Sequence, residues 1–139
     1  MKKTVLLVED DPALIRAVKT KLEKSDFAVV CATTAREAID HLENGPSRPV
    51  DVVWLDHYLL GPGTGLDVLE KAKNDAKYKD TPTFIVSNTA SPEKRRAYLQ
   101  LGATRFYIKA EHRLEDIVAD IQSSLSQGEA KPVEGNEAI

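Results

Sequence analysis

Short apolar runs alternate with longer amphipathic segments along most of this 139-residue chain, and this alternation constrains the fold more than any other feature. A run of roughly four to six residues without a polar face is typical of a strand buried on both sides of a parallel sheet. Each such run is followed by a segment whose apolar residues recur at helical spacing. The predicted strands are 4–8, 27–31, 50–55, 83–86 and 105–108.

Helix signals stand at the starts and ends of the segments between these runs. Pro12 suits a first helical turn, Thr33 or Thr34 caps the second segment, and Ser91 opens the fourth. Gly102 ends that fourth segment. The predicted helices are 13–24, 35–44, 64–73, 92–101 and 114–125.

The order of these elements determines the predicted architecture. Five strand-then-helix units imply a parallel sheet with helices on both faces, because each crossover must be right-handed. Ligands of such sheets bind beyond the carboxyl ends of the strands. The length fits one domain of roughly 150 residues, which we place over residues 1–126. Residues 127–139 are rich in Gly, Pro and Glu without periodicity, and we expect a disordered tail or a linker stub there.

Composition excludes several classes of protein. The formal net charge of −3 gives no general attraction to nucleic acid or to an anionic membrane. The longest apolar runs fall far short of the roughly 18 residues of a membrane-spanning helix, and residues 4–8 are too short a run for a signal peptide. The single cysteine, Cys31, cannot form an internal disulfide and fits a reducing compartment. We therefore expect a cytoplasmic protein without a membrane or nucleic-acid partner.

Polar side chains follow four of the five predicted strands, at the edge where ligands are expected. Carboxylates that converge there without a cation would repel one another and raise one another's pKa. Mg²⁺ relieves this repulsion, since it binds through one or two carboxylates and takes phosphate oxygens as further ligands. A lysine and a hydroxyl complete the set that phosphoryl transfer to a carboxylate requires. The side chains are Glu9, Asp10 and Asp11 after the first strand, Asp56 after the third, Ser87, Asn88 and Thr89 after the fourth, and Lys109 at the end of the fifth.

Four segments carry a resemblance to a known family. They are Val5-Leu-Leu-Val-Glu-Asp-Asp11, Val52-Val-Trp-Leu-Asp56, Phe84-Ile-Val-Ser87, and Leu101-Gly-Ala103 leading into Tyr107-Ile-Lys109. In this order, and at successive strand ends, they resemble the receiver domain of two-component response regulators over roughly Lys2 to Leu125. The resemblance implies a flavodoxin-like α/β fold, a doubly wound five-stranded parallel sheet of order 2-1-3-4-5 with five helices in three α/β/α layers. It also implies a phosphoprotein of a phosphorelay, which requires Mg²⁺ and accepts a phosphoryl group rather than acting as an enzyme.

The resemblance further implies roles for individual residues. Asp56 matches the phosphoacceptor that a partner histidine kinase phosphorylates, and Lys109 matches the lysine that pairs with the phosphate. Ser87 matches the switch hydroxyl, and Phe106 matches the switch aromatic. The metal ligands that the resemblance implies are Glu9, Asp10, Asp56 and the backbone carbonyl of Tyr58.

Partners follow from the same resemblance. The phosphoryl donor is expected to be a sensor histidine kinase or a phosphotransfer protein. Phosphorylation is expected to draw Ser87 and Lys109 inward and to repack Phe106 beneath one face of the domain. That face consists of the fourth predicted helix, the fifth strand and the fifth helix. It would control a downstream effector protein, and it is also the surface on which a homodimer would form.

The sequence departs from the family pattern at several positions. Asn88 stands where a small residue is more usual, and Ala110 follows Lys109 where the family usually has proline. Phe106 lacks a hydroxyl, and the loop after Asp56 is longer than the common form. We expect these departures to change kinetics and output geometry, because none of them removes a catalytic group.

Two other functions stay open at this point. A Mg²⁺-dependent phosphohydrolase with an aspartyl nucleophile would need a cap insertion, and a second aspartate at the position of Tyr58; the sequence has neither. A phosphorylation-independent interaction module would keep the fold alone. The complete set of site residues argues against such a module, whereas Asn88, Phe106 and Ala110 favour it.

Structural roles are expected for other conspicuous residues. Asp11 is expected to cap the first helix, and Trp54 and Cys31 are expected to pack in the core. No metal or catalytic role is expected for His57, and His112 is interpreted as a surface residue on a helix.

Overall fold

The structure is a computed structural model that describes residues 2–45, 49–88 and 91–126. Thr89, one of the polar residues expected after the fourth strand, lies outside the described residues, as does the predicted tail 127–139. The domain boundary at residue 126 therefore stays a prediction.

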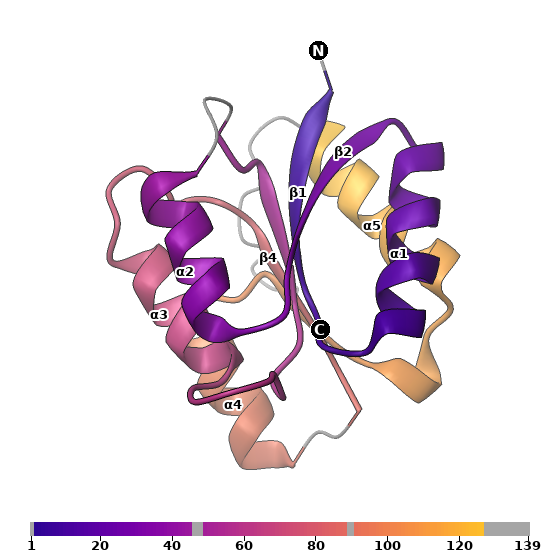
Figure 1. Cartoon of the computed structure of the whole chain (residues 1–139). Helices are drawn as coiled ribbons and strands as arrows, with labels where there is room; N and C mark the ends of the chain where they lie inside the picture. Colours follow the sequence, from indigo (N-terminus) through magenta and orange to yellow (C-terminus); the bar gives the residue numbers. More distant parts are fainter. Residues whose placement is uncertain (1, 46–48, 89–90, 127–139) are drawn as a thin grey trace.

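Five parallel strands form one sheet: β1 (Lys3–Val8), β2 (Phe27–Ala32), β3 (Val52–Leu55), β4 (Thr83–Ser87) and β5 (Arg105–Ile108). Their spatial order is β2-β1-β3-β4-β5, which confirms the predicted doubly wound sheet. In Figure 1, β1 runs from the N-terminus at the top toward the lower edge of the molecule. Because the strands are parallel, the carboxyl ends of all five meet at that lower edge.

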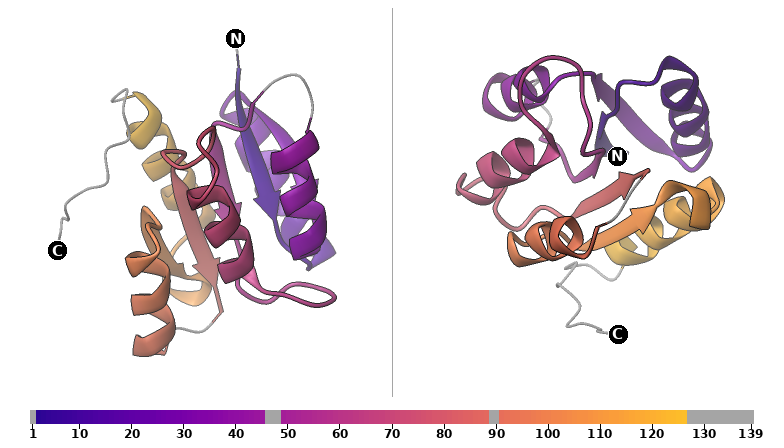
Figure 2. Two further views of the ribbon diagram at one scale, coloured as in Figure 1. Left: turned by 90° about the vertical axis from the view of Figure 1, so that its left-hand side faces the viewer. Right: turned by 90° about the horizontal axis from the view of Figure 1, so that it is seen from below.

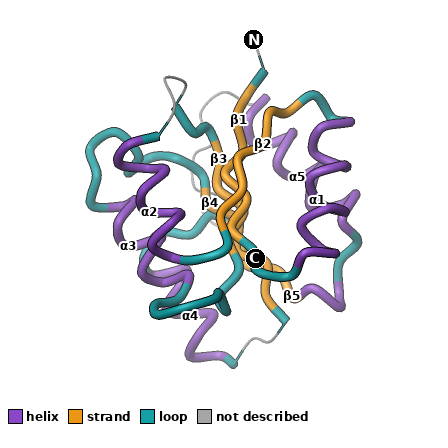
Figure 3. Tube along the Cα trace, in the orientation of Figure 1, coloured by secondary structure: helices purple, strands orange, loops and turns teal. Residues whose placement is uncertain are grey.

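Helices cover both faces of the sheet: α1 (Pro12–Lys24), α2 (Ala35–Asn44), α3 (Gly65–Lys73), α4 (Pro92–Gln100) and α5 (Leu114–Ser126), with a short 3₁₀ turn η1 (Lys109–Glu111) after β5. The helices α1 and α5 lie on one face, and α2, α3 and α4 lie on the other (Figure 1). Figure 3 shows the predicted three layers, with orange strands between purple helices. None of the helices in the described part of the chain has both the length and the apolar character needed to cross a bilayer.

Alternate residues of the central strands contribute to two separate hydrophobic cores. Leu6 and Val8 of β1 pack toward α2, α3 and α4, whereas Val5 and Leu7 pack toward α1 and α5. All four side chains are fully buried, so β1 needs the unbroken apolar run seen in the sequence. The edge strand β2 is less protected, and Cys31 is half-buried rather than fully buried as expected.

Side-chain caps fix the starts of the helices. Asp11 Oδ1 accepts the backbone N–H of Ala13 at 3.0 Å, which confirms the predicted cap role of Asp11. Thr34 caps α2 in the same way. Thr64 forms a capping box with Asp67 at the start of α3, so the glycine-rich loop before α3 ends in a capping turn.

Two predictions of local structure are wrong. The strand β3 begins at Val52 rather than at residue 50, because the Asp51 carboxylate accepts the backbone N–H of Thr4 and takes the place of a strand-to-strand bond. His112 is not helical, since the chain passes from β5 to α5 through the η1 turn and His112 follows that turn. Its ring contacts the ring of Tyr107 edge to face, with centroids 5.0 Å apart.

Candidate functional site

Three carboxylates converge at the carboxyl edge of the sheet. Glu9 and Asp10 follow β1 directly, and Asp56 follows the neighbouring strand β3. Each of the three side chains offers a carboxylate oxygen, and these oxygens all lie within 4.8 Å of one another. Glu9 and Asp56 are almost entirely buried, with exposed fractions of 1% and 3%. The right-hand view of Figure 2 looks onto this edge of the sheet.

Lys109, the first residue after β5, reaches two of these carboxylates. Its Nζ lies 3.1 Å from Asp56 Oδ2, to which it donates a hydrogen bond. The same Nζ lies 3.0 Å from Glu9 Oε1 in an ion pair without hydrogen-bond geometry. The second oxygen of Glu9, Oε2, accepts the backbone N–H groups of Asp10 and Asp11. The structure thus brings together four side chains that the sequence placed only at strand ends.

Burial and charge shift the pKa values of this cluster. Burial, reinforced by the Asp56 carboxylate, raises the pKa of Glu9 to about 7 against the opposing effect of Lys109. Burial alone would lower the pKa of Lys109, but the Glu9 and Asp56 carboxylates outweigh it and raise that pKa. Burial is thus the main reason that the pKa of Glu9 lies above that of an exposed glutamate, and the nearby Asp56 carboxylate adds to the effect.

The donor set fits a hard divalent cation. Carboxylate oxygens are the ligands that Mg²⁺ prefers in proteins, and Glu9, Asp10 and Asp56 supply them at one place. With all three ionised, three negative charges stand against the one positive charge of Lys109, which leaves a formal net charge of −2. A dication neutralises that remainder, so this acidic triad can hold a metal ion.

The two predicted switch residues, Ser87 and Phe106, are both buried on neighbouring strands. The Ser87 hydroxyl at the end of β4 is 0% exposed and has no hydrogen-bond partner in the described part of the chain. The Phe106 ring lies 5.7 Å from the Tyr98 ring and 5.6 Å from the Arg95 guanidinium, both on α4. A buried hydroxyl without a partner is costly, so Ser87 keeps an unused donor at the end of β4, and its switch role stays a prediction.

The sequence reading missed a contact between His57 and Tyr98. Asp56 Oδ1 accepts the backbone N–H of His57 at 2.7 Å, and His57 Nδ1 lies 2.6 Å from the Tyr98 hydroxyl. Burial, together with the charge of Lys94, lowers the pKa of His57. The one signal in the sequence was a tyrosine on a mostly polar helix, and Tyr98 is the one residue of α4 that is buried. Nothing in the spacing connects it to a residue 41 positions away.

Tyr58, whose backbone carbonyl was predicted as a metal ligand, lies in the loop after β3 with its side chain 52% exposed. Its hydroxyl accepts a hydrogen bond from Lys94 Nζ at 2.9 Å, and the same ammonium lies 4.4 Å from the ring centroid. The Tyr58 ring also meets the His57 ring edge to face at 4.7 Å. The loop is therefore tied to α4 at two consecutive residues, while the role of the Tyr58 carbonyl stays a prediction.

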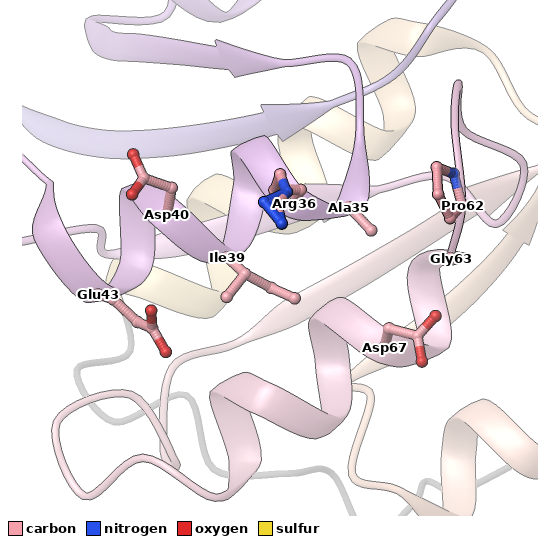
Figure 4. Close-up of a pocket in the computed structure, with 8 residues that line it drawn as sticks. All are labelled: Ala35, Arg36, Ile39, Asp40, Glu43, Pro62, Gly63 and Asp67. Atoms are coloured by element: carbon pink, nitrogen blue, oxygen red, sulfur yellow. The ribbon is translucent and has the colours of Figure 1, made fainter.

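A surface groove of about 490 Å³ lies between α2 and α3 (Figure 4). It is distinct from the acidic edge, the part of the sheet edge where Glu9, Asp10 and Asp56 converge. Two of its carboxylates are already engaged, Asp67 in the capping box and Glu43 in an ion pair with Lys71. None of the three converging carboxylates lines it. The lining residues are Ala35, Arg36, Ile39, Asp40, Glu43, Pro62, Gly63 and Asp67.

Comparison with known proteins identifies relatives of this chain. The profile of the response regulator receiver domain matches residues 5–122. The two-component response regulator ORR3 of Oryza sativa subsp. indica is 30% identical over 105 residues, which cover 75% of this chain and 78% of ORR3. The transcriptional regulatory protein TrcR of Mycobacterium tuberculosis is 32% identical over 136 residues, which cover 97% of this chain but only 50% of TrcR.

A solved structure shares the fold. The crystal structure of a CheY-like response regulator receiver domain protein from Methanospirillum hungatei matches with a TM-score of 0.81 at 27% identity, covering 91% of this chain and 96% of that one. A receiver domain is a phosphoacceptor rather than a conventional enzyme, which sets the phosphohydrolase hypothesis aside. The family profile spans most of the sequence, and the strand order and the acidic triad agree with it. The chain therefore belongs to the response regulator receiver domain family of two-component signalling.

Proposed function

We propose that this protein is a phosphoacceptor switch in which a histidine kinase or a phosphotransfer protein phosphorylates Asp56 and the resulting change controls an effector protein. The observation that carries the proposal is the convergence of Glu9, Asp10 and Asp56 within 4.8 Å, with Lys109 bound to two of them. Membership of the receiver domain family supports a histidine kinase as the source of the phosphoryl group.

The transfer step uses the Asp56 carboxylate as the nucleophile. One carboxylate oxygen attacks the phosphorus of a phosphohistidine whose other ring nitrogen carries a proton. A P–O bond forms while the P–N bond breaks, and the histidine leaves as neutral imidazole. Lys109 and the backbone N–H of His57 each hold one oxygen of Asp56 at rest. These two contacts orient the carboxylate for the attack.

We assign the metal ligands to Glu9, Asp10, Asp56 and the backbone carbonyl of Tyr58. When bound, Mg²⁺ supplies positive charge that offsets these carboxylates and the oxygens of the phosphoryl group. The formal charge of the cluster supports this assignment, because Lys109 alone does not balance three carboxylates.

The switch follows from the new acceptor oxygens on Asp56. The Ser87 hydroxyl donates a hydrogen bond to the phosphoryl group, and Lys109 pairs with it. Phe106, which packs against Tyr98 of α4, then repacks and alters the face made by α4, β5 and α5. That face controls the effector protein and is where a homodimer would form. The buried hydroxyl of Ser87, which has no partner among the described residues, supports this sequence of events.

The proposal is tested by intact mass after incubation with acetyl phosphate and Mg²⁺. We expect a single added phosphoryl group on the wild type, and none on Asp56→Asn or in the presence of EDTA. Asp40→Asn is a matched control, since Asp40 is an exposed carboxylate on α2 outside the acidic edge, and it should keep the adduct.

A different outcome would favour the phosphorylation-independent interaction module. Under that hypothesis the wild type takes up no phosphoryl group, and a beryllofluoride titration with Mg²⁺ leaves the fluorescence of Trp54 unchanged. Trp54 suits this measurement because it is the single tryptophan of the chain and lies fully buried in β3, two residues before Asp56.

A further inference from the structure

We infer that Tyr98 and His57 are positioning residues for phosphoryl transfer to Asp56, an inference that rests on the proposed function. The Tyr98 hydroxyl of α4 lies 2.6 Å from His57 Nδ1. The backbone N–H of His57 in turn donates to Asp56 Oδ1 at 2.7 Å. A helix on the face of the sheet is thereby connected to one oxygen of the acceptor carboxylate.

The contact between His57 and Tyr98 holds in either tautomer of the imidazole. A phenol hydroxyl can donate or accept, and the tautomer of His57 sets which of the two groups donates. The positioning role needs only that this contact holds the His57 ring in place.

Close packing keeps the Tyr98 hydroxyl in this place. Tyr98 is fully buried. A side-chain carbon at Gly65 would lie 2.6 Å from the Tyr98 oxygen and 2.4 Å from the backbone oxygen of Asp56, so only glycine allows the three groups to meet. The backbone N–H of Gly65 also donates to the carbonyl of His57 at 3.0 Å. Gly65 at the start of α3 is therefore packed tightly between the Tyr98 hydroxyl of α4 and the backbone that follows β3, and this packing holds the hydroxyl beside His57.

The contact between Tyr98 and His57 matters for phosphoryl transfer because the backbone N–H of His57 is one of the two groups that orient the Asp56 carboxylate. Lys109 holds Oδ2 at 3.1 Å, and the His57 N–H holds Oδ1. His57 follows Asp56 at the start of the loop after β3, and its ring is fixed by the Tyr98 hydroxyl and by edge-to-face contact with Tyr58 at 4.7 Å. Without the hydroxyl the His57 peptide gains freedom, and the carboxylate loses part of the orientation that in-line attack requires.

The test is a double-mutant cycle of Tyr98→Phe and His57→Ala. The readout is the rate of phosphoryl uptake from acetyl phosphate at saturating Mg²⁺, followed by intact mass. We expect each single variant to slow uptake by about three- to tenfold, the range that corresponds to the loss of one neutral hydrogen bond. The double variant should be close to the slower single variant, because both changes remove the same interaction.

Tyr107→Phe is the matched control. The Tyr107 hydroxyl also belongs to a buried side chain and donates a hydrogen bond of the same 2.6 Å length, to Asp120 of α5 on the opposite face of the sheet. We expect Tyr107→Phe to lower the urea midpoint of unfolding at least as much as Tyr98→Phe does, because hydrogen bonds to charged groups contribute more, while its rate of phosphoryl uptake equals that of the wild type.

The possible results separate this inference from the proposed function. Normal uptake by Tyr98→Phe would overturn the inference and leave the proposed function standing. Equal slowing by Tyr98→Phe and Tyr107→Phe, or rate effects that multiply in the double variant, would also overturn it, because the two side chains would then act through stability or independently. Failure of the wild type to take up a phosphoryl group, together with a Trp54 fluorescence that beryllofluoride leaves unchanged, would reject the proposed function, and the inference with it.

Discussion

The ammonium of Lys109 donates a hydrogen bond of 3.1 Å to Asp56 Oδ2, joining two residues that are 53 positions apart in the sequence. The same ammonium lies 3.0 Å from Glu9 Oε1. Both carboxylates are proposed metal ligands, so Lys109 and a divalent cation compete for the same negative charge. This competition gives Lys109 a measurable effect before any phosphoryl group arrives.

We predict that Lys109→Met binds Mg²⁺ more tightly than the wild type. Removing one positive charge about 3 Å from the ligand oxygens increases the negative potential of the site, and we expect the dissociation constant to fall by roughly tenfold. Isothermal titration calorimetry measures the change. Lys71→Met, which removes an exposed ammonium paired with Glu43 on α2, should leave Mg²⁺ binding unchanged. Weaker binding by Lys109→Met would mean that the lysine shapes the site rather than competing for it.

The raised pKa of Glu9 predicts how the stability of the metal-free protein depends on pH. A carboxyl pKa near 7 means that the folded protein holds this proton more tightly than the unfolded chain does. The resulting stabilisation is fully present below the unfolded pKa of about 4.3 and is lost as the pH rises through about 7. We expect Glu9 to account for a fall of about 2–3 kcal/mol in the free energy of unfolding between about pH 5 and pH 8.

Urea denaturation in EDTA at four pH values tests this dependence. Glu9→Gln is the control, because its side chain cannot ionise. The difference in unfolding free energy between wild type and variant should therefore change between about pH 5 and pH 8, and that change measures the contribution of Glu9. Saturating Mg²⁺ should reverse the trend, because the cation displaces the proton and favours the ionised carboxylate. A wild-type-minus-variant difference that is constant with pH would contradict the prediction.

The sequence predicted the acidic edge because strand periodicity alone determines it. The short runs of residues 4–8 before Glu9 and 52–55 before Asp56 indicate buried parallel strands, and parallel strands bring their carboxyl ends to one edge. The same rule placed Ser87 and Lys109 there. The position of such a side chain depends on where its strand ends. The pattern of apolar residues predicts that end.

The contacts of Tyr98 and His57 could not be predicted in this way. They depend on how α4 is rotated about its axis, and the sequence of α4 carries little information on that rotation because eight of its nine residues are not buried. His112 was misplaced for a related reason, since the η1 turn between β5 and α5 leaves no periodic signal. Packing of whole elements decides such positions, and a single sequence reports packing only through amphipathic patterns.

Gly65→Ala should destabilise the protein even though alanine usually favours a helix. The added carbon would meet the Asp56 backbone oxygen at 2.4 Å and the Tyr98 hydroxyl at 2.6 Å. The backbone oxygen cannot move aside cheaply, so we expect a loss of about 3 kcal/mol. Gly61→Ala is the comparison, because its φ of +72° is strained for alanine but the space around it is open. That variant should lose only about 1–2 kcal/mol. Urea denaturation that ranked the two variants in the opposite order would contradict this account.

The last prediction concerns Ser87, whose buried hydroxyl has no partner among the described residues. Burying a hydroxyl without a hydrogen bond costs about 1–3 kcal/mol. Ser87→Ala removes that cost, so the unphosphorylated protein should become more stable by about 1 kcal/mol. Thr83→Val is the matched control on the same strand, because the buried Thr83 hydroxyl donates to the carbonyl of Thr81 and its loss should lower stability.

The same Ser87→Ala variant should lose the response to beryllofluoride, a stable mimic of the phosphoryl group. In the wild type we expect the hydroxyl to turn toward the bound anion and Phe106 to repack, which changes amide hydrogen exchange in α4 and β5. In Ser87→Ala the anion still binds through Asp56 and Lys109, but the exchange rates of α4 should stay close to those of the free protein. A variant that is both less stable at rest and fully responsive would show that Ser87 is satisfied in the resting state and takes no part in the switch. We expect Ser87→Ala to be more stable than the wild type and to lose the hydrogen-exchange response to beryllofluoride, because in the wild type the Ser87 hydroxyl gains its hydrogen bond only when the phosphoryl group is present.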